Sequence, residues 1–130
     1  MNTLPLAFVG LIVLGAAAEE DKTAPFKNLE ILGQIVPNDL PDRERRHPCK
    51  IHTLHFAKGK TYVLDLISKD FDAWLRIADA EGKTIVQDDD SGGNLNSRIR
   101  FTAPRDENFQ IVATSFAGGA GTYVLKVRAE

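Results

Sequence analysis

Short stretches in which apolar and polar side chains alternate recur along most of this chain, and they constrain its fold more than any other feature. Alternation with a period of two places successive side chains on opposite faces of an extended strand. No stretch longer than one or two turns has the spacing of an amphipathic helix. We predict strands at four clear alternating stretches, one more apolar stretch and three weaker ones: 61–68, 73–78, 97–102 and 121–128; 108–115; and 31–36, 51–56 and 84–87.

Turn-forming residues separate these stretches. Glycine, which tolerates a positive φ, occurs in the connections at 57–60, 80–83 and 117–121. A proline opens the connection at 104–107, which we expect to close another pair of strands. Seven or eight short strands at this spacing predict an all-β fold, an antiparallel β-sandwich of jelly-roll-like form.

The N-terminal part of the chain differs from the rest. An uncharged apolar run at 4–15 is followed by three alanines, and the sequence turns acidic at Glu19. This pattern predicts a signal peptide cleaved after Ala18, because the run is shorter than the roughly 20 residues that a membrane span needs. An uncleaved N-terminal anchor is the alternative. We therefore expect a signal peptide at 1–18, a flexible mature N-terminus at 19–28, a domain at 29–130, and a secreted, periplasmic or cell-surface location without membrane contact after cleavage.

Charge and cysteine content narrow the function classes. A net charge of −2 argues against nucleic acid as a partner, because phosphate binding needs a basic excess. Cys49 is the single cysteine, so no intrachain disulfide can form, and we expect a partly buried thiol. His47, His52 and His55 lie near it, but a strand at 51–56 points His52 and His55 to opposite faces, which argues against a zinc site.

An acidic loop is the most distinctive polar segment. Three consecutive aspartates share a Gly-containing loop with a nearby asparagine, and two further aspartates precede the strand at 73–78. Ca²⁺ takes six to eight oxygen ligands, and carboxylates on such a loop can surround it. A solvated turn is the alternative, because turns use the same residue types. The candidate calcium ligands are Asp70, Asp72, Asp88, Asp89, Asp90 and Asn94.

Two side chains of the strand at 73–78 are candidate ligand contacts. Trp74 and Arg76 alternate with Leu75 and Ile77, so we expect them on the outer surface if Leu75 faces the core. An exposed aromatic ring beside a planar cation can stack on a sugar or anchor a protein contact. The alternative is that both cover the outer side of the sheet. The charged segment 43–48 is expected to be a solvated loop.

Four segments carry a family resemblance: 70–77 (DFDAWLRI), 79–83 (DAEGK), 88–99 (DDDSGGNLNSRI) and 121–125 (GTYVL). In this order they resemble the bacterial pre-peptidase C-terminal domain, particularly the versions in secreted planctomycete proteins, over about Leu29 to Arg128. The resemblance implies a jelly-roll-like sandwich that accompanies secreted hydrolases and assists secretion, targeting or substrate binding; some relatives bind calcium. No catalytic domain precedes this one, so we do not expect an auxiliary role toward an enzyme in the same chain.

Together these features predict a secreted, noncatalytic binding or accessory module that contacts a protein or a polysaccharide. Ca²⁺ is the one cofactor that the residues suggest. A calcium-stabilised structural scaffold is one alternative. A small metal-dependent hydrolase that uses Asp88 to Asp90 is another, although an exposed Gly-flanked loop offers little of the burial that shifts carboxyl pKa values apart.

Overall fold

The structure, a computed structural model, describes residues 28–130, so the predicted signal peptide and nearly all of the predicted tail lie outside the described residues. The described chain forms eight strands: β1 (Asn28–Ile35), β2 (Lys50–Phe56), β3 (Thr61–Ile67), β4 (Ala73–Ala78), β5 (Thr84–Asp88), β6 (Ser97–Thr102), β7 (Glu107–Ser115) and β8 (Gly121–Ala129). Every predicted strand is present, and β4 and β6 have the predicted bounds. Residues 28–130 contain no helix long and apolar enough to cross a membrane.

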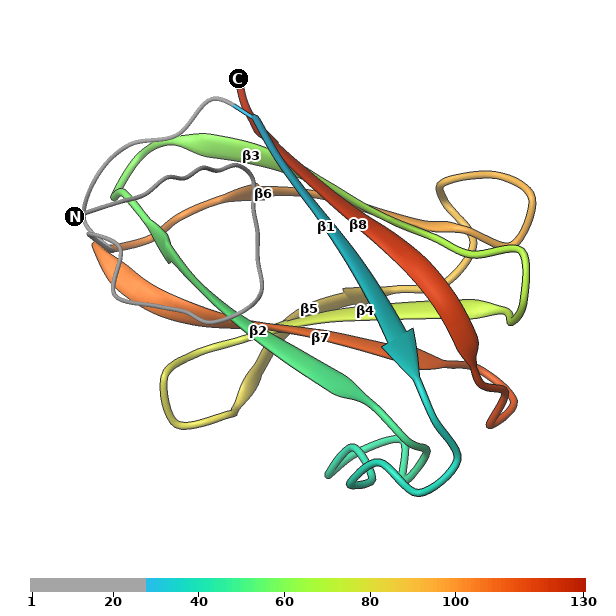
Figure 1. The fold of residues 1–130 in the computed structure, drawn as a ribbon. Helices are drawn as coiled ribbons and strands as arrows, with labels where there is room; N and C mark the ends of the chain where they lie inside the picture. The colour runs from blue at the N-terminus through green and yellow to red at the C-terminus, as the bar shows by residue number, and fades with distance from the viewer. Residues whose placement is uncertain (1–27) are drawn as a thin grey trace, which may run out of the picture.

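The strands form two antiparallel sheets that face each other (Figure 1). The first sheet has the order β1-β8-β3-β6 and the second has the order β2-β7-β4-β5. Each sheet interleaves strands from both ends of the chain: β8 lies between β1 and β3, and β7 lies between β2 and β4. This interleaving is the jelly-roll arrangement. The prediction of an antiparallel, jelly-roll-like sandwich is confirmed.

Most connections between successive strands cross from one sheet to the other. Residues 104–107 run from β6 in the first sheet to β7 in the second, so the expectation that they close a pair is wrong. Within residues 28–130, only the connection at 80–83 joins two successive strands that pair, β4 and β5. Gly82 has a φ of 87° in this hairpin, a conformation that favours glycine.

The core lies between the sheets, where the inward side chains of both meet. Phe56, Phe101 and Phe109 form its aromatic centre, with ring centroids 5.3 Å apart for Phe101 and Phe109 and 5.8 Å apart for Phe56 and Phe109. Tyr62 stacks on Phe56 with centroids 4.0 Å apart. Tilted and edge contacts at these distances add to the free energy gained by burying the rings. In β6, for example, the predicted alternation separates the buried Ile99 and Phe101 from the exposed Arg98 and Arg100.

Gly33 allows one polar contact across the core. It lies opposite Tyr123 on β8, and a Cβ at Gly33 would fall 2.3 Å from the tyrosine ring. Tyr123 instead reaches the second sheet, where its hydroxyl lies 2.7 Å from Nε2 of His52. Burial, followed by the charge of Lys50, lowers the pKa of His52. His55 faces the other way, with Nδ1 2.9 Å from Oδ1 of Asn108, as the predicted strand required.

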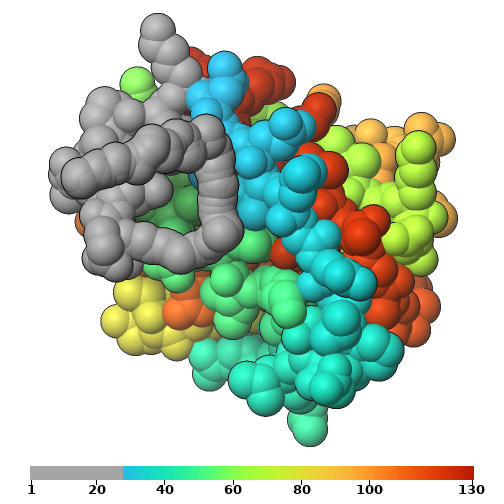
Figure 2. All heavy atoms as spheres, in the orientation of Figure 1, coloured from blue at the N-terminus to red at the C-terminus, as the bar shows by residue number. Residues whose placement is uncertain are grey.

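Residues 36–49, called the strap below, connect β1 to β2 and pack against the outer side of the second sheet (Figure 1). Thr114 of β7 donates to the Pro48 carbonyl at 2.8 Å, and Arg43 donates to the Glu81 carbonyl at 3.1 Å. The strap forms the lower part of the face in Figure 2. In the segment 43–48, which we expected to be a solvated loop, Arg43, Glu44 and Arg46 are exposed and no residue is buried. Side chains at three of its positions nevertheless bond to the sheet and its turns. Cys49, the last residue of the strap, is buried, as expected.

Candidate functional site

An ion pair that the sequence analysis missed holds the strap to the sheet. Asp42 on the strap accepts a hydrogen bond from Nη2 of Arg76 on β4, and both side chains are at most 2% exposed. Arg76 also donates through Nη1 to Oγ1 of Thr84 at 3.0 Å. The expected exposure of Arg76 is wrong. Its side chain points outward from β4, but the strap covers it, so no ligand can reach the guanidinium in this arrangement.

Asp42 is stabilised as an anion despite its burial. Burial raises the pKa of Asp42, but hydrogen bonds from the Arg45 backbone at 2.9 Å and from Arg76 outweigh it, so that the pKa is lowered overall. The local turn is closed by the Asp42 N–H, which donates to the His47 carbonyl at 2.7 Å. The strap therefore folds around the carboxylate that anchors it, because a buried charge without such partners is costly.

Trp74 faces outward from β4, as predicted, and packs with two side chains that the prediction did not include. The guanidinium of Arg45 lies 4.0 Å from the Trp74 ring centroid and 5.1 Å from that of Phe116. The two rings are 5.9 Å apart, and Nη2 of Arg45 donates to the Phe116 carbonyl at 2.7 Å. We call Arg45, Trp74 and Phe116 the aromatic cluster. Phe116 is its accessible member, at 47% exposed.

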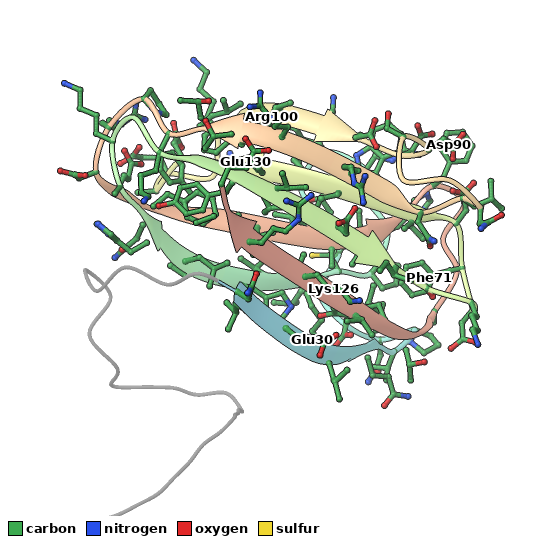
Figure 3. All side chains as sticks on the ribbon, turned by 90° about the horizontal axis from the view of Figure 1, so that it is seen from above. Glu30, Phe71, Asp90, Arg100, Lys126 and Glu130 are labelled. Atoms are coloured by element: carbon green, nitrogen blue, oxygen red, sulfur yellow. The ribbon has the colours of Figure 1, made fainter. Side chains whose placement is uncertain are left out.

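The predicted calcium ligands gather at one end of the sandwich. Asp70, Asp72 and Asn94 line a cleft of about 480 Å³ together with Phe71. Figure 3 shows Phe71 and Asp90 at the same end of the molecule. The segment before β4 and Asn94 of the acidic loop therefore lie near each other.

Two of the predicted ligands already accept hydrogen bonds within the chain. The Asp70 carboxylate accepts from the N–H and the hydroxyl of Thr122, at 2.8 and 3.0 Å. The Asp88 carboxylate accepts from the hydroxyl of Ser91 at 2.7 Å and from the N–H of Arg98 at 3.0 Å. These carboxylates fasten loops to neighbouring strands, which is a structural use of the same residue types.

Asp72 is in a different situation. Its Oδ1 atom is buried and makes no hydrogen bond. Burial, then the negative charges of Asp90 and Asp89, raise the pKa of Asp72. Three carboxylates therefore repel one another beside the cleft that Asn94 lines. Across residues 28–130, however, no group of three or more His, Cys, Asp or Glu side chains is arranged to hold a metal ion.

The aromatic cluster and these carboxylates adjoin each other. The Phe116 N–H donates to the Asp72 carbonyl at 2.9 Å, and Trp74 follows Asp72 by two residues, on the same side of the chain. We call the aromatic cluster together with Asp72, Asp89 and Asp90 the binding rim. Phe116 was not predicted to be part of this site, although it is an aromatic residue between a central strand and a Gly-rich connection, which is a signal that could have identified it.

No protein-family model matches this chain, and no curated protein sequence matches it. Several solved structures are similar to it in fold, and we describe two of them. PliG from Aeromonas hydrophila, a periplasmic lysozyme inhibitor of g-type lysozyme, has a TM-score of 0.59 and 14% identity, covering 80% of this chain and 87% of that one. The pre-peptidase C-terminal domain of a collagenase from Bacillus anthracis has a TM-score of 0.59 and 15% identity, covering 78% of this chain and 90% of that one. The fold is therefore the one that the family resemblance implied.

Proposed function

We propose that this chain is an exported, noncatalytic module that binds a protein or a polysaccharide through the binding rim. The observation that carries the proposal is the position of Phe116, which lies beside Trp74 and is 47% exposed. A large apolar ring gains free energy when it is buried, so an exposed one next to a second ring is suited to a contact surface.

The charge of the binding rim limits the classes of partner that can bind there. Asp72 lines the cleft together with Asp70 and Lys69, and the charges of Asp89 and Asp90 act on Asp72, so acidic side chains outnumber the one lysine there. The guanidinium of Arg45 is engaged with the two rings. Carboxylates accept hydrogen bonds from sugar hydroxyls and attract cationic side chains, and aromatic rings stack on sugars or on arginine. We therefore expect a neutral glycan or a basic protein surface, and not an anionic polymer.

The two similar structures support a role in contact and not in catalysis. One belongs to an inhibitor of an enzyme and the other to a domain of an enzyme. The first of these proteins is periplasmic, which agrees with the export that the apolar run at 4–15 predicts. The hydrolase alternative has less support, because both oxygens of Asp88 already accept hydrogen bonds.

The test compares two variants that each remove one exposed apolar side chain from the second sheet or its connections. Phe116→Ala removes the accessible ring of the binding rim, and Ile51→Ala removes a side chain that is 53% exposed elsewhere. Both are incubated with insoluble cellulose, chitin and peptidoglycan, and with immobilised proteins of the cell-surface fraction. We expect Phe116→Ala to weaken the binding seen with the unmodified chain by about tenfold or more, as a contact at the centre of an interface does, and Ile51→Ala to preserve it.

Two results would contradict the proposal. One is binding that Phe116→Ala leaves intact, because the contact would then lie elsewhere on the molecule. The other is release of soluble sugars or peptides from any of these polymers by the unmodified chain, because the module would then be catalytic.

A calcium-stabilised scaffold is the second candidate, and Asp72 is the observation that favours it. A cation would neutralise the repulsion among Asp72, Asp89 and Asp90 and would give the Oδ1 atom of Asp72 a partner. We expect millimolar Ca²⁺ to raise the melting temperature and a chelator to reverse the rise. Asp72→Asn should abolish this response, whereas Asp106→Asn, on a distant turn, should retain it. A melting curve that Ca²⁺ leaves unchanged would eliminate this candidate.

A further inference from the structure

The outer face of the first sheet carries four charged side chains in one row. The strand register aligns Glu30 on β1 with Lys126 on β8, Lys126 with Asp65 on β3, and Asp65 with Arg98 on β6. All four point away from the core, and their charges alternate across the sheet as minus, plus, minus, plus. Figure 3 shows Glu30 and Lys126 on this face of the molecule.

Three of these four side chains are accessible although they pair within the chain, whereas Asp65 is 15% exposed. Nε of Arg98 lies 2.6 Å from Oδ1 of Asp65, and Nζ of Lys126 lies 3.8 Å from Oε2 of Glu30. The side chains of Arg98, Lys126 and Glu30 are 52%, 55% and 60% exposed. Exposed pairs of this kind contribute little to stability, so the row is free to interact with charges on another molecule.

We propose that this face binds a second copy of the same chain. The two copies would be related by a two-fold axis that lies between the faces, runs parallel to the strands and passes midway between β8 and β3. Because strands are evenly spaced, this rotation places β1 over β6 of the second copy and β8 over its β3. Glu30 then faces Arg98 of the second copy, and Lys126 faces its Asp65.

Each contact occurs twice, because the interface of a two-fold dimer is self-complementary. The intrachain pairs remain intact. The Glu30–Lys126 pair of one copy lies over the Asp65–Arg98 pair of the other, with each charge facing one of opposite sign. The result is two groups of four charges in which every nearest neighbour has the opposite sign. An order such as plus, minus, minus, plus would place like charges opposite each other under this rotation.

The rows on either side are compatible with the same rotation. One row is apolar: Leu32, which is 78% exposed, aligns with Val124, and Val124 aligns with Ile67. The rotation places Val124 of one copy over Ile67 of the other, which buries both. The row on the opposite side, Asn28, Arg128, Val63 and Arg100, then has no like charges in direct opposition.

The size of the face predicts a weak dimer. Four strands and three rows of outward side chains cover on the order of 400 Å² per copy by strand spacing and rise. Specific interfaces usually bury about 800 Å² per partner, so we expect association in the micromolar to millimolar range with a strong dependence on salt. The aromatic cluster lies on the other sheet, so a dimer would leave both copies of the binding rim free.

Sedimentation velocity at low and high salt tests the proposal, with the purified chain at micromolar to millimolar concentration. The unmodified chain should dimerise at low salt and dissociate at high salt. The double variant Asp65→Arg/Arg98→Asp keeps the composition, the net charge and the 65–98 pair, but it sets like charges against Lys126 and Glu30 of the second copy. We expect its dimer dissociation constant to rise by about tenfold or more.

Adding Glu30→Lys/Lys126→Glu to that variant reverses the whole row. We expect the fourfold variant to dimerise as the unmodified chain does and to form no mixed dimers with it. The swap Glu81→Lys/Lys83→Glu, on the β4–β5 turn, is the matched control and should leave the dimer dissociation constant unchanged. A monomer at millimolar concentration in low salt would overturn the proposal, as would a double variant that dimerises as tightly as the unmodified chain. If the double variant fails to fold, mixed dimers between the fourfold variant and the unmodified chain would overturn it.

Discussion

The two outer faces of the sandwich differ in how far they expose an outward-pointing arginine. Arg76 on β4 and Arg98 on β6 both alternate with core residues and both point away from the core. Arg76 is 2% exposed, because the strap lies over it and supplies Asp42 as its partner. Arg98 is 52% exposed and pairs with Asp65 on the adjacent strand. Alternation thus indicates the direction of a side chain, whereas a long connection decides whether that direction leads to solvent.

Removing the buried carboxylate should have the largest effect on stability. Asp42→Ala leaves the guanidinium of Arg76 buried without a counter-charge and removes the acceptor of two strap N–H groups. We expect a loss of about 3–5 kcal/mol in the free energy of unfolding, measured by urea denaturation. A loss below about 1 kcal/mol would mean that water reaches the pair and that the strap does not seal this face.

Arg45→Ala should have a smaller effect that is visible at the single tryptophan. The substitution removes the cation from the Trp74 ring and the hydrogen bond to the Phe116 carbonyl. We expect a loss of about 1–2 kcal/mol and a red shift of the Trp74 fluorescence, because the ring gains contact with water. Arg43→Ala removes another strap arginine that bonds to Glu81 instead, and its emission should match that of the unmodified chain.

The stability that Asp42 contributes beneath the strap should also decrease in acid. The pKa of Asp42 is lowered in the folded state, so its contribution is fully present above the unfolded-state pKa of about 3.9 and is lost as the pH falls through the folded-state value. The stability difference between the unmodified chain and Asp42→Asn should therefore be constant near neutral pH and shrink below about pH 4. Because both proteins contain His52, its titration cancels in the difference. A stability difference that stays constant down to the acid transition would contradict the lowered pKa of Asp42.

Substitution on the outer face of the first sheet should have the smallest effect on the free energy of unfolding. Arg98→Ala removes an exposed pair with Asp65 and should cost less than about 1 kcal/mol. Added salt should reduce this cost further, because exposed charges are screened. Urea denaturation at low and high salt measures both. A cost of several kcal/mol that is independent of salt would show that this face is also covered.

The sequence was sufficient for the strands because alternation is a local property. β4 and β6 were predicted to the residue, and the outward direction of Trp74 followed from the same pattern. The strap has no periodicity, and Asp42 lies 34 residues before Arg76, so nothing local indicated that the two would meet. Burial of Arg76 could therefore not be predicted from the strand that carries it.

In the candidate site, too, contacts between residues distant in sequence could not be predicted. The residue types of the acidic loop predicted that carboxylates would gather at one end of the sandwich, and they do. Which carboxylates are already bonded depends on distant partners: Asp70 is fastened by Thr122, 52 residues away, whereas Asp72 has a buried oxygen without a partner. Phe116 entered the site because it lies beside Trp74 in space, 42 positions along the chain.

The most direct test of the difference between the two faces is a pair of double-mutant cycles. One cycle combines Asp42→Ala with Arg76→Ala, and the other combines Asp65→Ala with Arg98→Ala, each measured by urea denaturation. Each cycle isolates the energy that couples the two charges. We predict a coupling of about 2 kcal/mol or more for the pair beneath the strap and less than about 1 kcal/mol for the exposed pair. Equal couplings below about 1 kcal/mol for both pairs would contradict the claim that the strap buries one face and leaves the other open.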